Sequence, residues 1–112
     1  MSTHEQILSI IDSIRDDFDV LGKFAFSQQG PIPMVNDSFW RVVDAAQETK
    51  ELIEQEFTKT GQTFQSPVDW SGIEGFRFVT RQAGMPAMMA NAQLYSVYTM
   101  QLNQFFIQAQ GI

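Results

Sequence analysis

The sequence predicts an all-α fold of three to four helices, and three observations support this. Apolar residues recur at spacings of three and four along most of the chain, which is the pattern of amphipathic helices. Glycine and proline are concentrated between the periodic stretches, where they are expected to end helices. The chain has 112 residues and no cysteine, so residues 1–112 are expected to form one domain without disulfides.

The first helix is expected over residues 3–21. Thr3 with Gln6, or Ser2 with Glu5, has the spacing of an N-terminal capping box. Gly22 suits the position after the helix end, because glycine accepts a positive φ. Its acidic residues fall beside an apolar stripe that defines the buried face: Ile7, Ile10 or Ile11, Ile14, Phe18 and Leu21.

An ordered loop is expected next, because Gly30, Pro31 and Pro33 disfavour helix while the segment stays too apolar to remain in water. The second amphipathic, acidic helix is expected over residues 38–60, ending at Gly61. Its glutamates and lysines form the solvated side. Its buried stripe consists of Phe39, Val43, Ala46, Ile53 and Phe57.

Residues 61–72 are rich in turn-forming residues, and Phe64, Val68 and Trp70 are expected to hold them against the core. A short helix is predicted over residues 73–83. The last helix is predicted over residues 86–110, with Pro86 as its first residue.

The last predicted helix carries no charge, because all 13 acidic and 7 basic residues precede residue 82. Its apolar residues cover more than one face, and a single small domain is not expected to surround such a helix. We therefore interpret residues 86–110 as an assembly helix that packs against other copies or other subunits. The residues expected at this interface are Met88, Leu94, Tyr95, Val97, Tyr98, Leu102, Phe105 and Phe106.

Composition argues against several classes of partner. The net charge of −6 disfavours phosphate backbones, so nucleic acid is not expected. Glutamine and asparagine interrupt every apolar run of the last helix, so a membrane span is not expected either. The N-terminus lacks the pattern of a signal peptide, which leaves the cytoplasm, a signal-independent export route or a particle as the expected location.

No catalytic, cofactor or metal site is expected. His4 is the single histidine and lies at the start of the chain, without the partners that a general base needs. Nucleotide-binding, hydrolase and zinc motifs do not occur in the sequence. The acidic residues Asp16, Asp17 and Asp19 lack the glycine and glutamate of a calcium loop. The sequence therefore does not indicate an enzyme.

The favoured function is a non-enzymatic structural subunit of a rod, ring, filament or virion-type assembly. In composition, the neutral last helix resembles the terminal helices of axial proteins in flagellar and type III secretion rods. Trp70-Ser71-Gly72 resembles the W-x-G turn of the WXG100 secreted proteins, and this resemblance implies a helical hairpin with Trp70 and Gly72 at its corner. A third hypothesis is a bundle that binds an apolar ligand between Met and Phe side chains.

Overall fold

A computed structural model describes residues 2–27, 32–83 and 92–111. Within these ranges the chain forms five α-helices and no strand, which confirms the all-α prediction and exceeds the predicted number of helices. The helices are α1 (Thr3–Ser13), α2 (Arg15–Ser27), α3 (Ile32–Lys59), α4 (Trp70–Ala83) and α6 (Ala92–Gln110).

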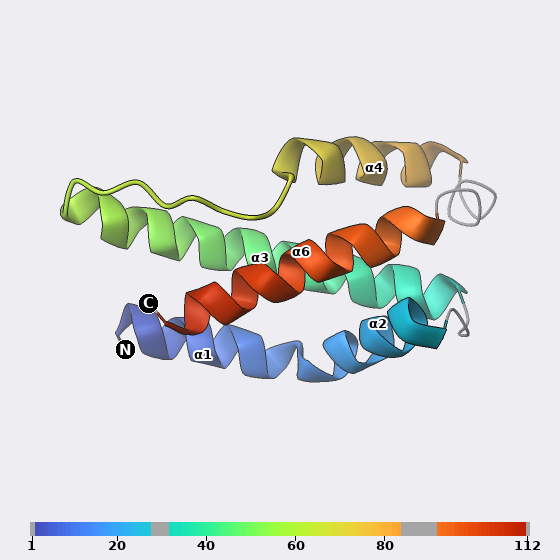
Figure 1. The fold of residues 1–112 in the computed structure, drawn as a ribbon, viewed down its shortest axis with the longest axis horizontal. Coiled ribbons are helices and arrows are strands. Elements are labelled where there is room, and N and C mark those ends of the chain that lie inside the picture. The colour runs from blue at the N-terminus through green and yellow to red at the C-terminus, as the bar shows by residue number, and fades with distance from the viewer. Residues whose placement is uncertain (1, 28–31, 84–91, 112) are drawn as a thin grey trace.

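The helices form an elongated bundle of 45 × 25 × 19 Å in which α6 is central (Figure 1). α1 and α2 follow one another along one side, and α4 lies on the other. α3 runs the length of the bundle, and α6 crosses in front of it between these two sides. α6 contacts α1, α2 and α3 directly and meets α4 through aromatic rings.

The predicted first helix is divided into α1 and α2 at Ile14, whose φ of −111° and ψ of 11° are not helical. The Ser13 hydroxyl donates to the Ile10 carbonyl (2.6 Å) and so competes with the backbone bonds of the last turn of α1. The predicted stripe survives the break, because Ile7, Ile14 and Leu21 are all buried. Ser2 caps α1 by accepting the amide of Glu5 (3.2 Å), as one of the two predicted caps requires.

Two predicted loop boundaries were wrong. α2 continues past Gly22 to Ser27, since a glycine inside a helix costs only about 1 kcal/mol relative to alanine and packing outweighs it. α3 begins at Ile32 instead of residue 38, with Pro33 in the first turn, where a backbone N–H has no helical partner to lose. Gly61, with a φ of 72°, follows the end of α3 as predicted. Residues 28–31 lie outside the described residues.

The buried face of α3 is the predicted one. Phe39, Val43, Ala46 and Ile53 are fully buried, and Phe57 is partly buried against the same core. Thr3 at the start of α1 donates to the Glu56 carboxylate (2.6 Å), which ties the N-terminal end of the bundle to α3.

The last helix is covered by its own chain, contrary to the expectation from sequence. Five of the predicted interface residues are at most 8% exposed: Tyr95, Tyr98, Leu102, Phe105 and Phe106. They are core residues, and their assignment to an interface was wrong. Rings from α2, α3 and α4 supply much of this cover. The segment between α3 and α4 doubles back along α3 and adds Phe64 and Val68 to it (Figure 1).

Two aromatic clusters hold α6 at positions ten residues apart. Near its start, the Tyr95 ring lies edge-on to Phe39 of α3 (5.1 Å) and Phe76 of α4 (4.9 Å). Near its end, Phe105 meets Trp70 (5.6 Å) and Phe64 (6.0 Å), again edge-on. Such ring pairs contribute about 0.5–1.5 kcal/mol beyond the area they bury, so each cluster fixes both the position and the rotation of α6.

Leu102 and Val97 of α6 offer a matched test of this assignment. Replacing the fully buried Leu102 with alanine should lower the free energy of unfolding by about 2–5 kcal/mol, because a cavity remains in the core. Val97→Ala, at a position that is 46% exposed, should change it by no more than about 0.5 kcal/mol. Urea denaturation followed by circular dichroism measures both. Equal, small effects would mean that α6 is not the centre of the core.

Candidate interaction surface

The exposed side of α6 carries large apolar side chains. Val97, Met100 and Ile107 are 46%, 63% and 62% exposed. Among the described side chains only two other large apolar residues are comparably exposed, Leu8 on α1 and Phe78 on α4. Three of the five therefore share one helix, which marks this face of α6 as a candidate contact surface.

These side chains follow a single line along the helix, which we call the α6 stripe. It consists of Gln93, Val97, Met100, Gln104 and Ile107, all of them exposed. Their spacings of three and four residues keep them on one face of a helix. No Asp, Glu, Lys, Arg or His occurs in α6, so the stripe combines exposed apolar area with neutral amides. In Figure 1 no other described element lies over the near side of α6.

Of the predicted interface residues, only Val97 lies on this stripe. Leu94 is partly buried against the core, and Met88 lies outside the described residues. The prediction missed Met100 and Ile107. Both are apolar, but they lie off the main apolar stripe of the predicted helix. The densest apolar face was assigned to a partner, but that face is the one that the protein's own core covers.

Trp70 and Gly72 do not form a turn between two helices, as the W-x-G resemblance implied. They lie in the first turn of α4, which Asp69 caps by accepting the amide of Gly72 (3.0 Å). The chain reverses earlier, in the segment that follows Gly61. The amide of Asp69 in turn donates to the Gln101 side chain of α6 (3.0 Å), so the cap also fixes α4 to α6.

Gly72 is required for space. A Cβ at this position would lie 2.3 Å from an Asp69 carboxylate oxygen and 2.7 Å from the Tyr98 hydroxyl. Both atoms end side chains, but the Asp69 carboxylate is held by its capping bond and Tyr98 is buried. The glycine therefore allows α4 to approach α6 closely at this end.

An open groove of about 660 Å³ lies between α3 and α4. Lys50 lies over the Trp70 ring, 5.3 Å from its centre, and the Gln47 amide donates to Glu74 (2.7 Å). The full lining is Gln47, Lys50, Glu51, Trp70, Ser71 and Glu74. Three of these six are charged, so this groove does not suit an apolar ligand.

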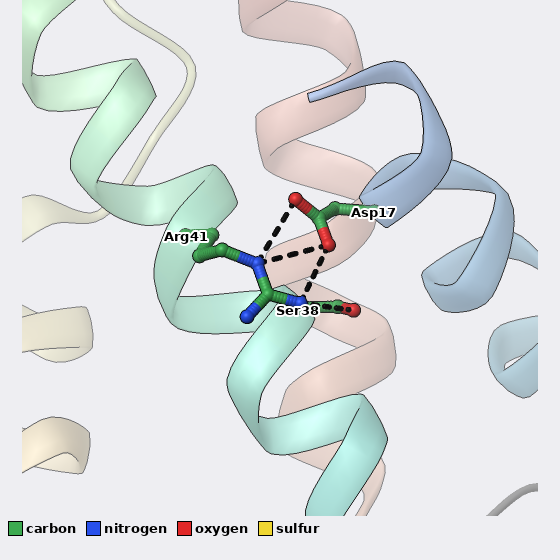
Figure 2. Close-up of polar contacts among 3 residues, drawn as sticks. All are labelled: Asp17, Ser38 and Arg41. Atoms are coloured by element: carbon green, nitrogen blue, oxygen red, sulfur yellow. Dashed lines mark hydrogen bonds and ion pairs between the residues drawn. The ribbon is translucent and has the colours of Figure 1, made fainter. Parts of the chain in front are cut away.

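An ion pair joins α2 to α3 (Figure 2). The Arg41 guanidinium donates from Nε to both oxygens of Asp17 (3.0 and 3.1 Å) and from Nη2 to one of them (2.8 Å). The same Nη2 also donates to Ser38 (3.3 Å). Hydrogen bonding from Arg41 lowers the pKa of Asp17 below its usual 3.8, although partial burial opposes the shift.

A second arginine joins α4 to α3. Arg77 donates to Asp44 (2.7 Å), and its guanidinium lies 4.8 Å from the centre of the Trp40 ring. The Trp40 indole donates to the Asn36 side-chain oxygen (2.8 Å), which also accepts the Tyr95 hydroxyl (2.8 Å). Burial raises the pKa of Tyr95 to about 12, so this hydroxyl remains a donor at physiological pH. These polar contacts connect helices and do not converge on an open cavity.

Comparison with protein-family models, with curated protein sequences and with solved structures found no match to this chain. The described helices include none that is long and apolar enough to cross a membrane. The same residues contain no group of three or more His, Cys, Asp or Glu side chains arranged to hold a metal ion. The α6 stripe is therefore the feature on which a functional proposal rests.

The two glycines of α4 provide a test of the close approach between α4 and α6. Gly72→Ala should lower the free energy of unfolding by about 1 kcal/mol, because the Cβ displaces the capping carboxylate of Asp69. Gly75→Ala, where a Cβ would meet nothing within 4 Å, should raise it by about 0.5–1 kcal/mol. Thermal denaturation of the two variants compares them directly. A stabilising Gly72→Ala change would contradict the described packing.

The Asp17–Arg41 pair predicts a pH dependence of stability. A carboxylate whose pKa is lowered in the folded state stabilises the fold above its unfolded pKa of 3.8, and this contribution disappears as the pH falls through the lowered value. Asp17→Asn should therefore cost about 1 kcal/mol at pH 7, since Arg41 is exposed and solvent screens the pair. The difference from the wild type should shrink as the pH falls below 3.8 and vanish once Asp17 is protonated in the folded state as well.

The control for this measurement is Asp16→Asn, which removes a neighbouring exposed carboxylate. It should leave the free energy of unfolding within about 0.5 kcal/mol of the wild type. If Asp16→Asn and Asp17→Asn had the same effect at pH 7, the loss would reflect net charge and not the bond to Arg41.

Proposed function

We propose that this protein is a non-enzymatic structural subunit of a larger protein assembly, and that the α6 stripe is its contact surface. One observation carries the proposal: Val97, Met100 and Ile107 stand exposed in line on a helix that has no charge. Apolar side chains that stay exposed to water contribute nothing to the stability of the protein. A partner that covers them removes their apolar area from water, which is favourable.

The size of the stripe agrees with an assembly that is held by many contacts. Completing the burial of a half-exposed Val, Met or Ile contributes about 1 kcal/mol, so three of them contribute about 3 kcal/mol per copy. Association costs about 4–15 kcal/mol in lost freedom of motion. A single stripe therefore supports a weak contact, and repeated contacts in a rod, ring, filament or shell would be needed for a stable particle.

The other two hypotheses from sequence receive less support. The WXG100-type hairpin depends on a turn at Trp70-Ser71-Gly72, and these residues begin a helix. The apolar-ligand hypothesis depends on Met and Phe side chains around an internal space. The groove between α3 and α4 is open and polar, and Met100 points into solvent. The exposed His4, in the first turn of α1, adds no argument for an enzyme.

The proposal predicts that one charge on the stripe disrupts the assembly and leaves the fold intact. In lysate of the cells that make the protein, the full chain should sediment well above its own mass of 12.7 kDa. Met100→Lys should shift it to the monomer position, because the contact would have to bury an unpaired ammonium group. Circular dichroism of the purified variant should match the wild type, since Met100 is 63% exposed.

Gln55→Lys is the matched control. It introduces the same charge at an exposed position of α3, outside the α6 stripe. Its sedimentation should equal that of the wild type. A wild-type chain that sediments as a monomer, or two lysine variants that behave alike, would defeat the proposal.

A further inference from the structure

The inner positions of the α6 stripe have a symmetry that fits a second copy of the same helix. They are 97, 100, 104 and 107, with spacings of three, four and three. This series is the same in both directions along the helix. When two copies of α6 are laid face to face and antiparallel, each of these four positions of one copy meets one of them on the other.

We propose, building on the proposed function, that the partner of the stripe is the same stripe of a second copy of this chain, in a two-fold antiparallel pair. Val97 then lies opposite the second copy's Ile107, and Met100 lies opposite its Gln104. The two-fold axis passes between Met100 and Gln104. A two-fold interface uses the same patch on both subunits and requires that the patch complement itself, which this series of positions satisfies.

Charge supports a second copy on this face. The net charge of −6 belongs entirely to the segments that precede residue 82, so two copies that meet through those segments repel one another. The stripe has no charge, and its glutamine amides both donate and accept hydrogen bonds. Identical acidic molecules can therefore approach most closely along this face.

The area of the stripe sets the strength of this pair. Five residues on each copy are far fewer than the roughly 20–30 per side of a stable, standard-sized interface. The pair is therefore weak and reversible, and high concentration favours it. Because a two-fold contact closes on itself, the larger assembly of the proposed function needs a second contact elsewhere on the chain. Cross-linking of the full chain at high concentration suits such a contact better than a measurement at high dilution.

The absence of native cysteine allows a direct test. Val97→Cys and Ile107→Cys chains are purified separately and treated with a short bifunctional thiol reagent, alone and after mixing. In the antiparallel pair, position 97 faces position 107 of the second copy, whereas two copies of position 97 are about 15 Å apart along the helix axis. A product of twice 12.7 kDa should appear in the mixture and be absent from either variant alone.

A Glu51→Cys chain, with its thiol exposed on α3, controls for random collision and should give no product alone or in mixtures. Circular dichroism checks that each variant is folded. Product from either stripe variant alone would indicate a parallel or shifted contact and overturn the antiparallel pair. Loss of the native assembly on Met100→Lys without any cross-linked product would overturn the pair and leave the proposed function standing. A chain that neither cross-links nor assembles would overturn both.

Discussion

The burial of α6 is the constraint on which the rest of the bundle depends. Every other described helix places apolar side chains against it, and the segment between α3 and α4 does the same. Tyr95 and Phe105 each receive rings from two other elements, so α6 joins α4 and the segment before it to the core that α1 and α2 form with α3. Arg41 and Arg77 then hold α2 and α4 to α3 at the periphery.

The neutrality of α6 follows from this central position. A charge facing the core would need a buried partner, and desolvation would cost more than a surface ion pair returns. The buried hydroxyl of Thr99 forms its hydrogen bond within the helix, because it donates to the Tyr95 carbonyl (2.5 Å). In the described part of the chain no buried side-chain nitrogen or oxygen lacks a hydrogen-bond partner. The outer face of α6 also lacks charged residues, although its side chains are exposed and burial does not require them to be neutral. This exposed but uncharged face is what distinguishes the α6 stripe.

Periodicity predicted which faces of α1, α2 and α3 are buried, because the three- and four-residue spacing of Ile7, Phe39 and Ile53 depends only on helix geometry. It did not predict the break at Ile14, where the Ser13 hydroxyl competes with the helical backbone bonds, or the early start of α3, where Pro33 occupies a first-turn position that needs no N–H. For α6 the sequence indicated more than one apolar face. Which of them the chain itself covers depends on how the other helices and the segment after α3 pack together, and no local pattern encodes that.

The position of α6 between distant parts of the chain also determines how the protein folds. α1 and α6 are in contact although about eighty residues separate them in sequence. In an up-and-down bundle each helix can dock on its sequence neighbour, whereas here the central helix joins partners from both ends of the described chain. Closing that large loop costs entropy before the contacts compensate for it. Folding should therefore be slower than in helical bundles of low contact order, because the core that α1, α2 and α3 share is completed only when α6 docks across this separation.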